Sequence, residues 1–161
     1  MSKVSLFEQA SLEWEQGNNR KAFELFRKAA LQGDPSAQHN LGYFYDEGEG
    51  IEKNTQQALY WYKKAAKNGE ICSCSNIAEI YRLAGKIQRA KFWLLKAVEQ
   101  GDGDAAFELA KLYLSQKRMD NLTKAVEYLK MVTSSKMVTE ASLEEAHLLL
   151  EQLKVGWVAI S

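Results

Sequence analysis

A segment of the sequence recurs along the chain, and this repetition constrains the fold more than any other feature. Residues 22–34 (AFELFRKAALQGD) and 58–70 (ALYWYKKAAKNGE) align without a gap. A third copy occupies residues 90–102 (AKFWLLKAVEQGD), and a fourth, residues 125–132 (AVEYLKMV), lacks the closing glycine. Such periods are typical of architectures in which each unit buries its apolar face against the next one. The sequence therefore predicts an array of similar units.

Each unit has the pattern of a helical hairpin. The recurring segment carries alanine and aromatic or aliphatic residues at helical spacing, which predicts an amphipathic second helix, here called B. A first helical segment, called A, precedes each B helix and has a small residue in its middle. We expect the neighbouring helix to approach A closely at this residue. The small residues are Ala10, Gly42, Ala78 and Ala110.

The expected helix ends have their own signals. Asp34 and Pro35 suit an N-cap followed by a first-turn proline. The spacings Ser5-x-x-Glu8 and Ser142-x-x-Glu145 predict capping boxes that start the first and the last helix. The glycines that close three of the copies suit the left-handed conformation that ends a helix. These glycines are Gly33, Gly69 and Gly101.

The composition agrees with an all-α fold. Pro35 is the one proline among 161 residues, and residues with high helix propensity are abundant. A chain of this size buries enough surface to fold without a disulfide framework or a metal. We expect a single domain over residues 1–161, an α-solenoid of four hairpins at about 5–33, 34–69, 70–101 and 102–133. A capping helix and an apolar tail follow at 141–161, and the tail either packs on the cap or binds another chain.

The second hairpin resembles a known repeat. Residues 37–51 follow the pattern A-x-x-x-L-G-x-x-Y-x-x-G-x-G-I, and residues 58–69 follow A-x-x-W-Y-x-K-A-A-x-x-G. Both are similar to the consensus of the Sel-like repeat, a longer relative of the tetratricopeptide repeat. The resemblance extends over about residues 5–132. It implies a right-handed superhelix whose concave surface holds protein or peptide partners and which performs no enzymatic chemistry of its own.

Charge and motifs exclude several other classes of function. Lys plus Arg and Asp plus Glu both number 21, and this balance disfavours a nucleic-acid binder. We expect no membrane segment and a cytoplasmic location, because the chain has no long apolar run and its start lacks a signal-peptide pattern.

His39 and His147 stand far apart without a catalytic motif, so we expect no enzyme and no cofactor. The spacing of acidic residues at 46–52 does not fit a calcium loop. Cys72 and Cys74, which are separated by one residue, do not fit the spacing of a zinc or redox pair.

The A helices supply the candidate binding residues. In related helical hairpins the concave surface is lined by A-helix residues just before the small residue, just after it and one turn later. Trp14 and Phe107 have an alternative, which is packing against a neighbouring helix. The acidic members of the set outnumber the basic ones, which favours a basic partner. The candidates are Phe7, Ser11, Trp14, His39, Asn40, Tyr43, Asp46, Ser75, Asn76, Glu79, Arg82, Phe107, Glu108 and Lys111.

Two functions are compatible with this pattern. The first is a non-enzymatic adaptor that holds a partner protein or peptide along the concave face. The second is a bacterial immunity protein or antitoxin that neutralises a cognate toxin domain by covering it, for which an acidic face would suit a basic toxin. The sequence leaves the partner and the oligomeric state open.

Overall fold

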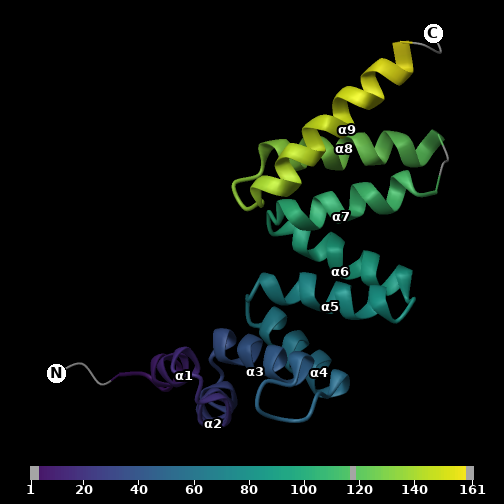
Figure 1. The fold of residues 1–161 in the computed structure, drawn as a ribbon. Coiled ribbons are helices and arrows are strands. Elements are labelled where there is room, and N and C mark those ends of the chain that lie inside the picture. The colour runs from purple at the N-terminus through teal and green to yellow at the C-terminus, as the bar shows by residue number, and fades with distance from the viewer. Residues whose placement is uncertain (1–3, 117–118, 159–161) are drawn as a thin grey trace. The chain divides into compact units, whose positions relative to one another are not determined.

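The computed structural model describes residues 4–116 and 119–158, and within these ranges the chain is helical apart from its turns and one isolated bridge. Figure 1 shows the helices in chain order. Their bounds are α1 Leu6–Glu15, α2 Asn19–Leu31, α3 Pro35–Glu47, α4 Thr55–Lys67, α5 Cys72–Leu83, α6 Ile87–Glu99, α7 Gly103–Leu114, α8 Met119–Ser134 and α9 Glu140–Val158. The predicted all-α repeat fold is confirmed, with A helices α1, α3, α5 and α7 and B helices α2, α4, α6 and α8.

The chain divides into two compact units, Met1–Lys86 and Ile87–Ser161. Unit 1 contains α1 to α5 and unit 2 contains α6 to α9. The boundary falls between the two helices of the third repeat. None of the described helices is both long and apolar enough to cross a bilayer.

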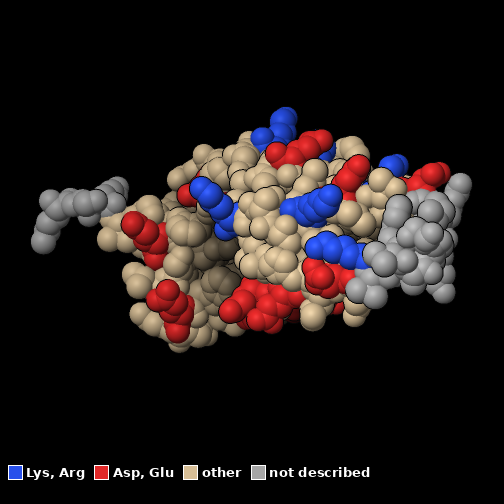
Figure 2. Space-filling view, turned by 90° about the horizontal axis from the view of Figure 1, so that it is seen from above, with Lys and Arg blue, Asp and Glu red and all other residues tan. Residues whose placement is uncertain are grey.

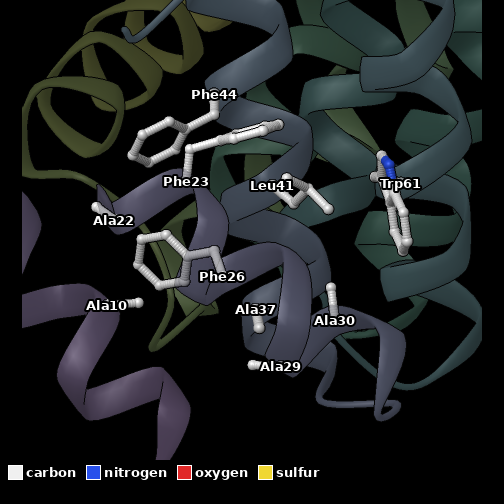
Figure 3. Close-up of a cluster of buried hydrophobic side chains, with 10 residues drawn as sticks. All are labelled: Ala10, Ala22, Phe23, Phe26, Ala29, Ala30, Ala37, Leu41, Phe44 and Trp61. Atoms are coloured by element: carbon white, nitrogen blue, oxygen red, sulfur yellow. The ribbon is translucent and has the colours of Figure 1, made fainter. Parts of the chain in front are cut away.

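The core of unit 1 is built from aromatic rings and alanines. Phe26 and Phe44 are fully buried, and their ring centroids lie 5.6 Å apart. Figure 3 shows the rings of Phe23, Phe26 and Phe44 grouped together, with Trp61 of α4 set apart to one side. Alanines fill the positions where the helices approach closely, so large rings and small residues interlock.

The small residues in the A helices lie where the pattern predicts close approach. Ala10, Ala78 and Ala110 are buried. A Cβ atom on Gly42 would lie 2.7 Å from Cδ1 of Tyr62 in α4, so only glycine fits beneath that ring. This contact fixes the spacing of α3 and α4.

Most predicted helix ends are confirmed. Ser5 and Glu8 form the capping box of α1, and the Asp34 side chain accepts a hydrogen bond from the Ala37 amide at the start of α3. The three closing glycines have positive φ angles of 97°, 94° and 92°. The last helix differs from the prediction, because α9 begins at Glu140 and Ser142 lies within its first turn. The Thr139 hydroxyl oxygen accepts from the Ser142 amide instead, so the capping role falls three residues earlier.

In unit 2, the segment between α8 and α9 ties both helices to the start of α7. The Gly103 amide donates to the Met137 carbonyl at 2.7 Å, and the Ser135 hydroxyl donates to the Gly101 carbonyl at 2.9 Å. Ala146, Leu150 and Leu153 of α9 pack on a core formed by α7 and α8. Helix α9 extends through Val158, so part of the predicted tail is helical. Whether the tail packs on the cap lies outside the described side chains.

Candidate functional site

The candidate residues of unit 1 lie on three successive A helices, α1, α3 and α5. We call the sides of these helices that carry them the A-helix face. Most of these residues are half-buried, while Glu79 and Arg82 are exposed. The half-buried members are Phe7, Ser11, Trp14, His39, Asn40, Tyr43, Asp46, Ser75 and Asn76.

Two aromatic residues of this face belong partly to the core. The Trp14 ring centroid lies 5.5 Å from that of Tyr43 and 5.3 Å from that of Phe44. The Phe7 ring packs edge-on against Phe26 at 5.7 Å. Each ring therefore has one side against the unit 1 core, which holds it rigidly without burying it completely. The alternative that Trp14 packs against a neighbouring helix is therefore correct for one side of its ring.

Next to these rings lies a polar group around Tyr62. The Tyr62 side chain forms a hydrogen bond with Asn76. Burial raises the pKa of the Tyr62 phenol, and the Asp46 carboxylate raises it further. Burial also raises the pKa of Asp46, which Lys53 opposes and Glu47 and Glu79 reinforce. The polar group thus links α3, α4 and α5. Tyr62 is 1% exposed, so it supports the Asn76 side chain from beneath the surface.

Carboxylates lie around Tyr43 and Asp46 in this region. Burial raises the pKa of the Tyr43 phenol, and the nearby Glu47 and Glu49 raise it further. Several carboxylates nevertheless have local partners. Arg82 donates to both carboxylate oxygens of Glu79 at 2.6 Å, and Lys53 lies 3.9 Å from Asp46.

These partners reduce the negative charge of the face. Glu8 is also engaged, since it accepts from the Ser5 amide in the capping box. The acidic excess is therefore smaller than the residue count suggests. On the side drawn in Figure 2, acidic and basic side chains form small groups, and neither sign covers the surface.

His39 is a packing residue between repeats. Its Nδ1 lies 2.8 Å from the hydroxyl oxygen of Ser73 in α5, and its ring centroid lies 5.4 Å from that of Tyr62. Burial lowers the His39 pKa, although the Glu70 carboxylate acts in the opposite direction. Ser73 is fully buried, so this contact holds the His39 ring between α3 and α5.

In unit 2, the candidates Phe107, Glu108 and Lys111 lie on α7. Phe107 is only 3% exposed and belongs to the core with Leu129 and Val132, so its packing alternative holds. The Lys111 ammonium lies 4.7 Å from the centre of the Phe107 ring and pairs with Glu108. Two of the three candidates therefore remain at the surface.

The helical pattern does not identify two polar residues of this region. Tyr62 is a core residue of α4, and its side chain also forms a hydrogen bond with Asn76. Gln38 is fully buried, where it donates to the Ala30 carbonyl and accepts from the Asn68 amide group. Nothing in the helical spacing distinguishes Gln38 from a surface glutamine, because its partners come from the preceding and the following B helix.

The side chains that could bind a metal or react, in the part of the chain that the structure describes, are scattered. Within the described ranges, no three His, Cys, Asp or Glu side chains are grouped as metal ligands would be. Cys74 is buried in α5, whereas Cys72 is exposed. His147 is exposed on α9.

Comparison with known sequences finds the same repeats. The sequence model of the Sel1 repeat matches residues 13–34, 35–70, 81–102 and 103–131, which is more than half of the chain. NMB1327, an uncharacterized protein of Neisseria meningitidis serogroup B, is 35% identical over 96 residues, covering 60% of this chain and 20% of that protein. The chitin synthase regulator SKT5 of Saccharomyces cerevisiae is 45% identical over 51 residues, covering 32% of this chain and 7% of the regulator.

Solved structures share the fold. A Sel1 repeat protein from Oxalobacter formigenes superimposes with a TM-score of 0.70 at 27% identity, over 80% of this chain and 56% of that one. The protective antigen c5321 of uropathogenic Escherichia coli, which displays an SLR fold, superimposes with a TM-score of 0.67 at 24% identity, over 91% and 44% of the two chains. The chain thus spans about half or less of the length of each protein named here.

Proposed function

The chain belongs to the Sel1 repeat family, as its second hairpin predicted, and on this premise we propose that it is a non-enzymatic adaptor. Sel1 repeats generally act as protein-interaction modules. In this proposal, the A-helix face of unit 1 binds a partner protein or peptide. One observation carries it: side chains from three repeats gather on this face. The Trp14 ring contacts Tyr43, and the buried Tyr62 is hydrogen-bonded to Asn76 and lies within electrostatic range of Tyr43 and Asp46.

The chemistry of the face suits a polypeptide ligand. Rings fixed on one side by the core, such as Trp14 and Tyr43, offer apolar area with little loss of side-chain entropy on binding. The half-buried amide and carboxylate of Asn76 and Asp46 lie next to them and can pair with backbone groups. A few well-placed aromatic anchors with polar neighbours supply most of the energy in many interfaces.

A charge swap tests this assignment with little effect on the fold. In Glu79→Arg/Arg82→Glu the exposed ion pair and the net charge are retained, while both charges presented to a partner are reversed. The matched control is Glu151→Lys/Lys154→Glu on α9, which swaps another exposed i,i+3 pair. Affinity capture from the native cell, followed by titration calorimetry with the captured protein, compares both variants with the wild type.

The proposal expects a captured protein that binds the wild type and the α9 control equally and the α5 swap at least about tenfold more weakly. Thermal melts of all three proteins should agree, because exposed pairs contribute at most about 1 kcal/mol. Equal binding to all three proteins would remove the A-helix face from the proposal.

The immunity hypothesis is a narrower form of the same proposal, in which the partner is a basic toxin domain. The carboxylates that raise the pKa of Tyr43 and Tyr62 favour a partner with a basic surface. Its test is genetic: a gene for a toxic protein should lie directly before this one, and co-expression should protect cells from that toxin. A toxin that kills equally with and without the chain would contradict this form and leave the adaptor proposal intact.

A further inference from the structure

The helices of unit 1 separate positive from negative charge. Its A helices α1, α3 and α5 carry six carboxylates and one cation, Arg82. Its B helices α2 and α4 carry seven cations and one carboxylate, Glu24. The net charge of zero therefore conceals two regions of opposite sign within one unit.

Four of the cations lie at the C-terminal ends of α2 and α4. They are Arg27, Lys28, Lys64 and Lys67, and together we call them the basic B-helix face. Lys28 and Lys64 occupy the same position of two consecutive repeats. Both helices pack on the same core, since Phe26 of α2 and Trp61 of α4 belong to one cluster.

The cations of this face are not committed to carboxylates of the chain. Among the described residues, ion pairs are found for Lys21, Lys53 and Arg82 of unit 1 but for none of these four. Arg27, Lys28 and Lys67 are exposed, and Lys64 is half-buried. The A-helix face is the reverse, because its one cation, Arg82, pairs with Glu79 on the same helix.

Aromatic rings fix the position of one ammonium group. Nζ of Lys64 lies 5.8 Å from the ring centre of Tyr60 and 5.2 Å from that of Trp61. Tyr60 itself is 55% exposed, so its ring is accessible to a ligand. The face therefore combines a pre-oriented cation with an accessible aromatic ring.

We propose that the basic B-helix face binds an acidic segment of a partner polypeptide. Carboxylates of that segment pair with the four cations, and its apolar side chains contact Tyr60 and the exposed Leu31. This surface is separate from the A-helix face and does not depend on the function proposed for it. The chain then acts as a bridge between two polypeptides of opposite charge.

Two features favour carboxylates over other polyanions. Glu24 lies one turn before Arg27 and Lys28 on α2. Its carboxylate repels a nucleic-acid backbone, which carries a charge on every phosphate. A peptide can avoid this repulsion by placing a neutral residue opposite Glu24. Among the described side chains of α2 and α4, the large apolar ones that are exposed are Leu31 and Tyr60, too few to anchor a helix pair in a bilayer.

The experiment measures binding of the full chain to three probes by fluorescence anisotropy or sedimentation. The probes are a labelled polyglutamate peptide of about 15 residues, an oligothymidylate of similar length, and vesicles containing about one quarter phosphatidylserine. The test variant is Arg27→Gln/Lys28→Gln/Lys64→Gln/Lys67→Gln. Its control, Lys86→Gln/Lys130→Gln/Lys136→Gln/Lys154→Gln, removes the same charge from exposed lysines elsewhere.

The proposal expects polyglutamate to bind the wild type more tightly than either other probe at about 50 mM salt, and more weakly as salt rises. The test variant should lose affinity at least about tenfold, and the control less than about twofold. Equal losses in both variants would show that only net charge matters and would overturn the proposal. Preference for the oligonucleotide or the vesicles would overturn it in favour of those ligands.

Discussion

At the scale of single residues, Gly42 determines how closely α3 and α4 approach. A Cβ atom there would meet the Tyr62 ring at 2.7 Å, and Tyr62 in turn supports Asn76 of the A-helix face. We predict that Gly42→Ala destabilises the chain by about 1–3 kcal/mol through overpacking. In an open helix, the same change stabilises by about 0.5–1 kcal/mol. Urea unfolding measures the sign, and a gain in stability would contradict this packing.

His39 predicts a dependence of stability on pH. Burial lowers its pKa in the folded state, so the unfolded chain takes up its proton first as the pH falls. The stability that neutral His39 provides is complete above about pH 6.5 and decreases below it. We expect the melting temperature to fall from about pH 7.5 to about pH 5.5, and to fall less in His39→Gln. Parallel curves for the two proteins would contradict this assignment.

Residue-level prediction from the sequence succeeded where the cause is local. The capping box of Ser5 and the cap of Asp34 follow from neighbours within three residues, and both are confirmed. Gln38 was out of reach, because its partners Ala30 and Asn68 are 8 and 30 residues away. The half-burial of His39 is of the same kind, since its partner Ser73 comes from the next repeat.

At the scale of elements, Trp61 anchors α4 in the core of unit 1. This residue is 7% exposed and lies in the same cluster as Phe26, Leu41 and Phe44. We predict that Trp61→Ala costs about 3–5 kcal/mol, which is the usual cost of removing a large core side chain. Thermal melting followed by far-ultraviolet circular dichroism measures the loss. A melting temperature close to that of the wild type would contradict the assigned register of α4.

The attachment of α9 depends on Asp104. Its carboxylate accepts hydrogen bonds from the amide and the hydroxyl of Thr139, directly before α9. Although burial opposes it, hydrogen bonds from Ser142 and Thr139 lower the Asp104 pKa. We predict that Asp104→Ala lowers the free energy of opening of α9 by about 1–2 kcal/mol, while α8 keeps its protection. Amide hydrogen exchange measures both helices, and equal loss in both would contradict this role.

Helix positions were mostly predictable because the repeat sets them. The start of α9 was not, since Ser142 and Glu145 have the spacing of a capping box and yet lie inside the helix. Contact with Asp104, which is distant in sequence, places Thr139 at the cap instead. The candidate surface was predictable as a set of A-helix positions, whereas the burial of Phe107 required the structure.

At the scale of the whole molecule, the two compact units predict two steps of opening. In a repeat array, stability is close to a sum of local terms and nearest-neighbour terms. We therefore expect Gly42→Ala, which lies in Met1–Lys86, to reduce amide protection in α1 to α4 and to leave α7 and α8 unchanged. Native-state hydrogen exchange as a function of urea distinguishes these steps. Uniform loss along the chain would indicate a single cooperative unit.

The junction between repeats is built in the same way at two places. Gly33 and Gly101 both have a positive φ, and the aspartate that follows each one caps the next helix through the amide three residues later. The capping hydrogen bond at each junction depends only on residues next to it. A duplication or deletion within the gene whose end points fall at this junction would leave both flanking helices with intact ends. Arrays of this kind can therefore gain or lose whole hairpins. The number of repeats can change in evolution independently of the surface residues that each repeat carries.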